Sequence, residues 1–132
     1  MFFFESKEIK QRKAELSIAP HDPATHFNLG AAYNKAGYIK EAVNEFEETI
    51  KINPNSAEAH FNLGVLYENL NQGEKAIVHI LKAGNLFSEK NDSVNKMESR
   101  KLLKEFYKKF GFKPEDMKME KYNNNFFNLF IT

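Results

Sequence analysis

A block of sequence occurs twice in this chain. The residues HFNLG stand at positions 26–30 and again 34 residues later, at positions 60–64. Two further residue types recur at the same spacing, as Tyr33 and Tyr67 and as Ala42 and Ala76. Repetition with a fixed period in the thirties is typical of arrays of stacked helix pairs. The repeat therefore predicts an all-α fold in which each period supplies two helices.

The first period has the signals of two helices joined by a turn. Asp22 is suited to cap a helix that begins at Pro23, because proline fits the first helical position. Gly37 predicts the end of this helix. Pro54 predicts the end of the next one, since proline cannot continue a helical hydrogen-bond ladder. Apolar residues at helical spacing form the buried stripe of this second helix: Ile39, Ala42, Val43, Phe46 and Ile50.

The second period repeats the first. It predicts a helix from about Ala57 to Leu70, a turn that contains Gly73, and a partner helix after it. Gly30 and Gly64 would lie inside the first helices of the two periods, where glycine costs about 1 kcal/mol relative to alanine. Because the glycine recurs at one register, we expect the paired helix to approach closely at both positions.

These residues resemble the tetratricopeptide repeat family. Its pattern is W-x₂-L-G-x₂-Y, followed by an alanine, an aromatic residue, a second alanine and a proline. The matching residues are Leu29, Gly30, Tyr33, Ala42, Phe46 and Pro54 in the first copy, and Leu63, Gly64, Tyr67, Ala76 and Ala83 in the second. The departures are His26, Thr49, His60, Ile80 and Ser88. The resemblance covers residues 22–88 and implies a short right-handed α-solenoid of two helix pairs with flanking capping helices.

The remaining sequence is expected to flank these repeats within one domain of residues 1–132. Asp92 or Ser93 is suited to cap a helix that reaches Phe110, and Gly111 would end it. The segment from Pro114 to about Lys121 is compatible with one more short helix. The expected parts are a degenerate N-terminal capping helix (5–20), repeat one (22–55), repeat two (56–88), a C-terminal capping helix (92–111) and a tail (112–132).

The family resemblance implies that the first helices of the repeats line a concave groove that binds a partner. By helical angle, the residues expected to face it are Phe27, Asn28, Ala31 and Lys35 in repeat one and Glu58, Phe61, Asn62, Val65 and Asn69 in repeat two. An asparagine amide both donates and accepts hydrogen bonds, as the backbone of an extended peptide requires. The alternative interpretation is that Phe27 and Phe61 pack between neighbouring helices and have no binding role.

One specialisation of the family is not expected. A subset of tetratricopeptide repeat proteins grips the acidic C-termini of heat-shock chaperones with lysines, asparagines and an arginine along the groove. Here Phe27 and Ala31 stand where the first lysine and asparagine would be, and Glu58 has the wrong charge for a carboxylate partner. Asn62 alone matches.

No catalytic or metal-binding motif is present in the sequence. HExxH, a glycine-rich phosphate loop and a nucleophile elbow are all missing, so we expect no enzyme activity, no cofactor and no metal. His26 and His60 occupy the position where the family usually has tryptophan, which favours a packing role for both rings. The net charge of +1 gives no excess of either sign, so neither nucleic acid nor a membrane is an expected partner. Cytoplasm is the expected location, since no stretch approaches the length of a membrane span.

We therefore expect a non-catalytic adaptor or scaffold that binds a segment of another protein. Two alternatives stay open: an accessory subunit of an enzyme complex, and a structural subunit of a homo-oligomer joined through its phenylalanine-rich termini. For the second, exposed apolar residues would supply the contact. They are Phe126, Phe127, Leu129, Phe130 and Ile131 at one end and positions 2–4 at the other.

Overall fold

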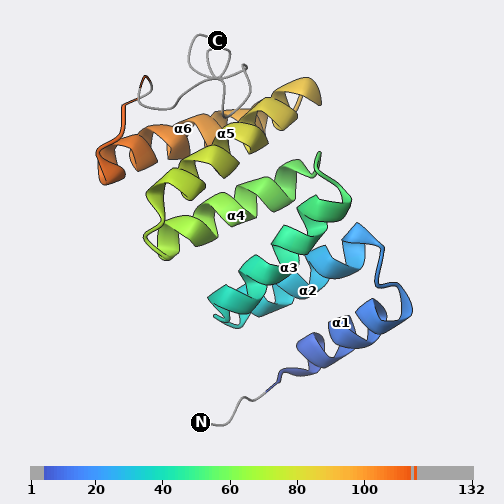
Figure 1. The fold of residues 1–132 in the computed structure, drawn as a ribbon. Coiled ribbons are helices and arrows are strands. Elements are labelled where there is room, and N and C mark those ends of the chain that lie inside the picture. Colours follow the sequence, from blue (N-terminus) through green and yellow to red (C-terminus); the bar gives the residue numbers. More distant parts are fainter. Residues whose placement is uncertain (1–4, 114, 116–132) are drawn as a thin grey trace. The chain divides into compact units, whose positions relative to one another are not determined.

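The computed structural model describes residues 5–113 and residue 115, and this part of the chain folds into α-helices without a strand (Figure 1). The helices are α1 (Lys7–Ile18), α2 (Pro23–Lys35), α3 (Ile39–Ile52), α4 (Ala57–Asn69), α5 (Gly73–Glu89) and α6 (Ser93–Phe110). The all-α prediction is confirmed. The short helix predicted over Pro114–Lys121 and the apolar residues of both chain ends lie outside the described residues. In the described part, no helix is long and apolar enough to cross a bilayer.

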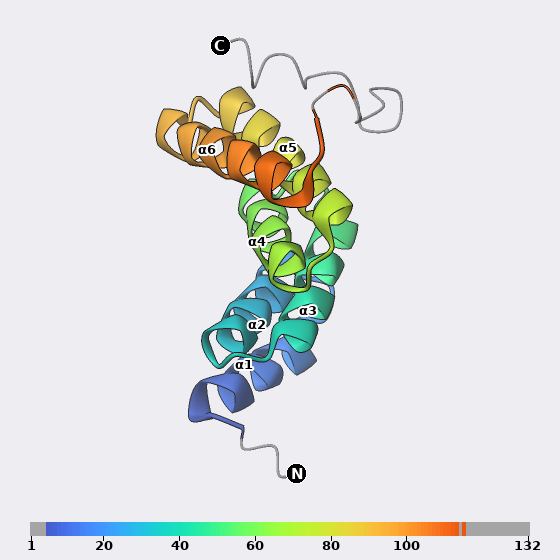
Figure 2. The same ribbon diagram turned by 90° about the vertical axis from the view of Figure 1, so that its left-hand side faces the viewer.

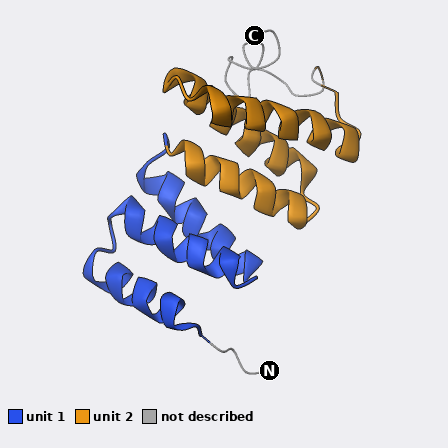
Figure 3. Ribbon diagram, turned by 180° about the vertical axis from the view of Figure 1, so that it is seen from behind, with its two compact units in different colours: residues 1–55 blue, residues 56–132 orange. Residues whose placement is uncertain are grey.

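The chain divides into two compact units, residues 1–55 and residues 56–132 (Figure 3). Unit 1 contains α1 to α3, and unit 2 contains α4 to α6. The boundary falls between the two sequence periods. Within unit 1, α2 packs against both α1 and α3; within unit 2, α5 packs against both α4 and α6 (Figures 1 and 2). The sequence period therefore marks a structural unit as well as a repeated pattern.

Side-chain caps start four of the described helices. In each case a serine or aspartate oxygen accepts a backbone N–H of the first turn, which satisfies a donor that the helix itself cannot. The capping residues are Ser6 for α1, Asp22 for α2, Ser56 for α4 and Asp92 for α6. The caps predicted at Asp22 and Asp92 are confirmed. Helices α3 and α5 have no side-chain cap and follow tight turns instead.

Those tight turns share one geometry, and it also occurs after α6. The backbone carbonyl of a buried tyrosine near the helix end accepts a hydrogen bond from the backbone N–H of the fifth residue after it. The pairs are Tyr33 with Tyr38, Tyr67 with Gln72 and Tyr107 with Phe112, at 2.9, 2.9 and 3.1 Å. The fourth residue after each tyrosine has positive φ: Gly37 at 85°, Asn71 at 59° and Gly111 at 69°. Helix α5 ends in the same way, with the Asp92 N–H bonded to the Phe87 carbonyl at 2.9 Å and Asn91 at a φ of 58°, so this turn closes first and second helices alike.

The glycines inside the first helices lie at close contacts, as predicted. A Cβ added at Gly30 would lie 3.1 Å from the Phe46 ring of α3. One added at Gly64 would lie 2.5 Å from the side chain of Ile80 on α5 and 3.2 Å from the Ala76 carbonyl oxygen. The second helix of each pair therefore fills the space that a side chain at the glycine would take.

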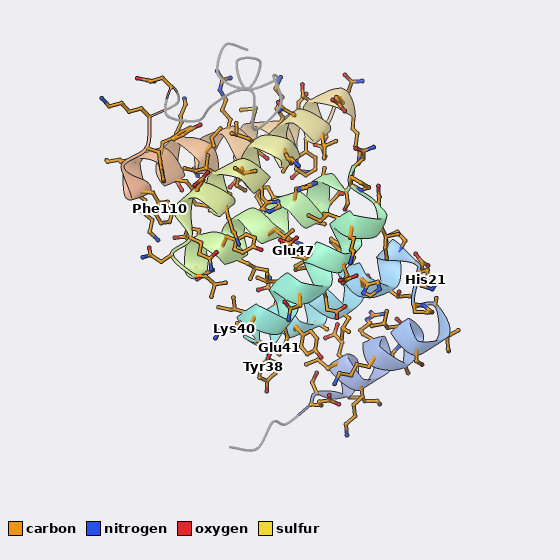
Figure 4. The ribbon with its side chains drawn as sticks, viewed as in Figure 1. His21, Tyr38, Lys40, Glu41, Glu47 and Phe110 are labelled. Atoms are coloured by element: carbon orange, nitrogen blue, oxygen red, sulfur yellow. The ribbon has the colours of Figure 1, made fainter. Side chains whose placement is uncertain are left out.

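The predicted position of Gly73 is wrong by a small margin. This residue begins α5 and does not lie in the preceding turn. A Cβ there would collide with the ring of Phe110, at the end of α6 (Figure 4). The start of α5 and the end of α6 are thus in close contact, and an ion pair between Lys109 and Glu68 joins α6 to α4. These contacts fix the position of α6 within unit 2.

Candidate partner-binding surface

The residues predicted to bind a partner lie on α2 in unit 1 and on α4 in unit 2. Their exposure falls into two classes. The exposed residues are Asn28, Ala31 and Lys35 on α2 and Glu58 and Asn69 on α4. The half-buried residues are Phe27 on α2 and Phe61, Asn62 and Val65 on α4. Each helix therefore presents one mixed face, with apolar side chains beside accessible polar ones.

The side chains of Phe27 and Phe61 pack partly into the interior of their own helix pairs. The ring of Phe27 meets Phe46 of α3 edge-on, with centroids 5.3 Å apart and an interplanar angle of 65°. The ring of Phe61 meets Phe87 of α5 at 6.3 Å and 66°. Phe61 also packs against a buried cluster that contains Ala57 and Ala83. Neither ring is the fully open aromatic that the sequence pattern suggested, although both remain partly accessible.

Glycine at the next turn explains this packing. Phe27 and Gly30 are three residues apart on α2, so they share one face of the helix. Because Gly30 has no side chain, the Phe46 ring approaches α2 closely enough to touch Phe27. Phe27 and Gly30 therefore both lie against the Phe46 ring of the paired helix.

The asparagines at the equivalent positions keep their polar groups available. Among the described residues, the amides of Asn28 and Asn62 form no hydrogen bond with the protein. Asn69 differs, because its side-chain nitrogen donates to the Val65 carbonyl of its own helix at 3.3 Å. The predicted series of amides thus reduces to one donor–acceptor group on each first helix, at the same register in α2 and α4.

The charged residues of these two faces have opposite signs. The ammonium of Lys35 lies 3.5 Å from the Glu8 carboxylate of α1, in an exposed pair that holds the lysine only weakly. Glu58 lies in the first turn of α4, where a carboxylate interacts favourably with the helix dipole. The two faces therefore carry charges of opposite sign, one on α2 and one on α4.

A polar contact inside each helix pair was not foreseen from the sequence. His26 of α2 and Glu45 of α3 are 19 residues apart, and so are His60 of α4 and His79 of α5. The Nδ1 atom of His26 lies 2.9 Å from the Glu45 carboxylate, and its Nε2 atom lies 2.8 Å from the Pro20 carbonyl. In unit 2 the Nδ1 atoms of His60 and His79 are 3.0 Å apart, and the two rings stack. The shared spacing of 19 residues was the signal in the sequence that could have revealed these contacts.

The two histidine contacts respond differently to protons. Burial lowers the pKa of His26, but the hydrogen bonds to Glu45 and Pro20 outweigh it and raise that pKa above its usual value. Burial and the neighbouring His60 ring lower the pKa of His79 to about 3, with Lys82 and Lys75 adding repulsion. The contact between the paired helices thus favours the charged form of His26 in unit 1 and the neutral form of His79 in unit 2.

His60 has the packing role that the sequence predicted for it. His60 is 2 % exposed, and His79 also stacks on the Tyr67 ring at a centroid distance of 5.5 Å. The part of the chain that the structure describes holds no group of three or more side chains placed to bind a metal ion. The aromatic and imidazole rings between α4 and α5 are therefore best explained as an interior contact of the helix pair.

Two family models match the chain, a TPR repeat over residues 32–71 and a tetratricopeptide repeat over residues 57–87. The chain is a tetratricopeptide repeat protein. The second match begins at the start of α4 and ends within α5, so it coincides with one structural helix pair. A comparison of this tetratricopeptide repeat protein with curated proteins finds no match.

Solved structures with the same fold confirm the helical-repeat architecture. The Yersinia enterocolitica type III secretion translocator chaperone SycD is similar with a TM-score of 0.73 and 15% identity, over 76% of this chain and 70% of SycD. MamA is similar with a TM-score of 0.56 and 17% identity, over 93% of this chain and 82% of MamA. At these identities the likeness establishes a shared fold.

Proposed function

We propose that this tetratricopeptide repeat protein is a non-catalytic adaptor or scaffold that binds a segment of another protein on the first helices of its repeats. Repeats of this family are typically interaction modules without catalytic activity. The proposed contact residues are those that the sequence predicted on α2 and α4. An accessory role in an enzyme complex would use the same surface.

One observation carries this proposal: the same binding unit is built twice. Asn28 and Asn62 occupy the same register, and each amide is accessible and not used by the described protein. Each lies directly after a half-buried phenylalanine, Phe27 or Phe61. An amide satisfies both the donor and the acceptor of a peptide backbone, and an aromatic edge supplies an apolar contact for a neighbouring side chain. Repetition of this pair suits an extended segment better than a small molecule.

The charges on the two faces bear on the net charge of the proposed partner. Lys35 on α2 and Glu58 on α4 balance each other in sign. A bound segment would then be held through its backbone and apolar side chains and would carry little net charge. This chemistry agrees with the absence of the lysine and asparagine set that grips acidic C-termini.

The test is a peptide selection with the full chain, followed by affinity measurements on variants. Asn28→Ala and Asn62→Ala should each weaken the selected peptide about fivefold, since one lost hydrogen bond is worth about 1 kcal/mol. Asn44→Ala is the matched control, because Asn44 is an exposed asparagine on the second helix of repeat one. Equal affinities for all three variants, at unchanged melting temperatures, would contradict the proposed site.

The homo-oligomeric alternative depends on residues 126–131, which lie outside the described residues. Light scattering on the full chain and on a chain that ends at residue 122 separates this alternative from the adaptor. A mass of two or more chains that falls to one chain after truncation would favour the oligomer. A single-chain mass in both samples would favour the adaptor.

A further inference from the structure

Helix α6 carries an exposed row of side chains that is apolar at one end and basic at the other. Its members are spaced by four, three and four residues, so they lie on one side of the helix. They are Met97, Lys101, Lys104 and Lys108, and all four are exposed. Met97 is 70% exposed, and Val94, one turn earlier, is 77% exposed. The two large apolar side chains thus lie together at one end of a basic row.

The three lysines of this α6 row are available to a partner. None of them forms an ion pair with another described residue. Lysines three and four residues apart on a helix repel one another, so carboxylates placed opposite them would be favourable. An open hollow of about 410 Å³ lies along part of the row, and it is lined by Met97, Arg100, Lys101, Lys104 and Glu105. The charge of this lining is positive, which favours an acidic partner.

Helix α3 carries a row of the same spacing and of opposite charge. Its members are Glu41, Glu45, Glu48 and Ile52. Glu41 and Glu48 are exposed, and Ile52 is 38% exposed. Glu45 is half-buried and bonded to His26, and Glu48 has only an exposed ion pair with Lys51 at 3.9 Å. Such a surface pair is weak, so Glu41 and Glu48 remain able to bind a cation from outside.

The α3 row and the α6 row match residue by residue when the two helices run antiparallel. Ile52 then lies opposite Met97, Glu48 opposite Lys101, Glu45 opposite Lys104 and Glu41 opposite Lys108. Eleven residues of helix span about 16 Å, so the match extends over three turns. A parallel arrangement fails at both ends, because it sets Glu41 against Met97 and Ile52 against Lys108. Charge and apolar character therefore select one orientation.

We propose that α6 of one copy of this chain binds α3 of a second copy, antiparallel and in this register. Nucleic acid or an anionic membrane could satisfy the lysines, but neither accounts for an acidic row with an apolar end at identical spacing in the same sequence. The contact joins two different surfaces, so it is head-to-tail, and further copies add until a ring closes or a filament forms. It does not involve Asn28 or Asn62, so it is tested independently of the proposed partner-binding surface.

Charge exchange in the full chain tests this contact. Glu41→Lys with Glu48→Lys reverses the α3 row, and Lys101→Glu with Lys108→Glu reverses the α6 row. Each double variant should self-associate about tenfold more weakly than the natural chain, because like charges then face each other. An equimolar mixture of the two double variants should associate as strongly as the natural chain, since every α3 row again meets an α6 row of opposite charge. Sedimentation equilibrium over a series of concentrations measures the association constants.

A matched control exchanges two charges on the same helices outside the rows. Lys40→Glu with Glu98→Lys changes exposed residues that lie about 100° around the helix from a row member, and it should associate like the natural chain. Circular dichroism checks the helical content of every variant. The proposal is overturned by a natural chain that stays monomeric, by reversed variants that associate like the natural chain, or by a mixture that does not recover.

Cysteine pairing tests the register separately, because the natural chain has no cysteine. Chains with Ile52→Cys and chains with Met97→Cys are mixed in equal amounts and oxidised. The mixed disulfide should form at least about tenfold faster than either homodimeric disulfide, since docking raises the effective concentration of the mixed pair alone. Lys82→Cys, at an exposed position of α5, replaces Ile52→Cys in the control and should show no such preference. Equal rates for mixed and homodimeric products would rule out the antiparallel register.

Discussion

Single glycines set the spacing of the helix pairs. Gly30 and Gly64 stand at the same register, yet the surrounding space differs. At Gly30 the nearest group is the Phe46 ring at 3.1 Å from an added Cβ, and at Gly64 it is Ile80 at 2.5 Å, with a backbone oxygen also within 3.2 Å. With a Cβ at position 30, the Phe46 ring need shift only slightly. With a Cβ at position 64, Ile80 must move substantially, and the backbone at Ala76 limits the room.

Alanine substitutions should separate the two sites. Alanine gains about 1 kcal/mol over glycine in a helix, while overpacking costs about 1–3 kcal/mol. Gly30→Ala should therefore leave the free energy of unfolding nearly unchanged, and Gly64→Ala should lower it by about 1–2 kcal/mol. Chemical denaturation of both variants measures the difference. Equal stability of the two variants would mean that the contact at Gly64 relaxes without cost.

The buried histidine pair should make unit 2 sensitive to acid. The pKa of His79 is about 3 in the folded chain and about 6.5 in the unfolded chain. Between these values the unfolded state binds the proton and the folded state does not, so stability falls as the pH falls from 6.5 toward 3. The groups that face His79 are His60, Lys75 and Lys82, and all three disfavour its charged form.

Thermal unfolding at pH 7 and pH 5 tests this statement. The melting temperature of the natural chain should fall on acidification, and His79→Gln should reduce that fall. His26→Gln is the matched control in unit 1. The raised pKa of His26 contributes stability below its unfolded pKa that is lost as the pH rises through the folded value, so its removal should increase the acid sensitivity. An unchanged pH response in His79→Gln would contradict the assignment.

At the scale of elements, the sequence predicts the repeats more accurately than the ends of the chain. Repetition, capping residues and glycine register predicted α2 to α5 to within a residue or two. Asp92 or Ser93 as a cap and Gly111 as the end predicted a helix over residues 92–111, and α6 runs from Ser93 to Phe110.

The same limit applies to the candidate binding residues. Helical angle predicted accessible faces for Asn28 and Asn62; in the structure Asn28 is exposed and Asn62 is half-buried. It could not show that Phe27 and Phe61 lean on Phe46 and Phe87, because that contact depends on how closely two helices approach. The histidine contacts could not be predicted from helical angle either, since the partner of each histidine lies on the other helix of the pair.

At the scale of the molecule, the proposed division of surfaces is simple. The second helices bury the interior of each pair, and the first helices offer the amides of Asn28 and Asn62 to a partner. Tetratricopeptide repeat proteins of this size have small cores, so each covered apolar side chain matters to stability. The binding proposal is the part of this account on which function depends.

Nuclear magnetic resonance of the full chain, labelled with ¹⁵N, tests the binding proposal most directly. A peptide selected for binding is titrated into the protein, and the side-chain amide signals of all asparagines are followed. We predict the largest shifts at Asn28 and Asn62, with smaller changes at Asn44 on α3 and Asn95 on α6. Shifts concentrated at Asn44 or Asn95, with Asn28 and Asn62 unmoved, would contradict the account.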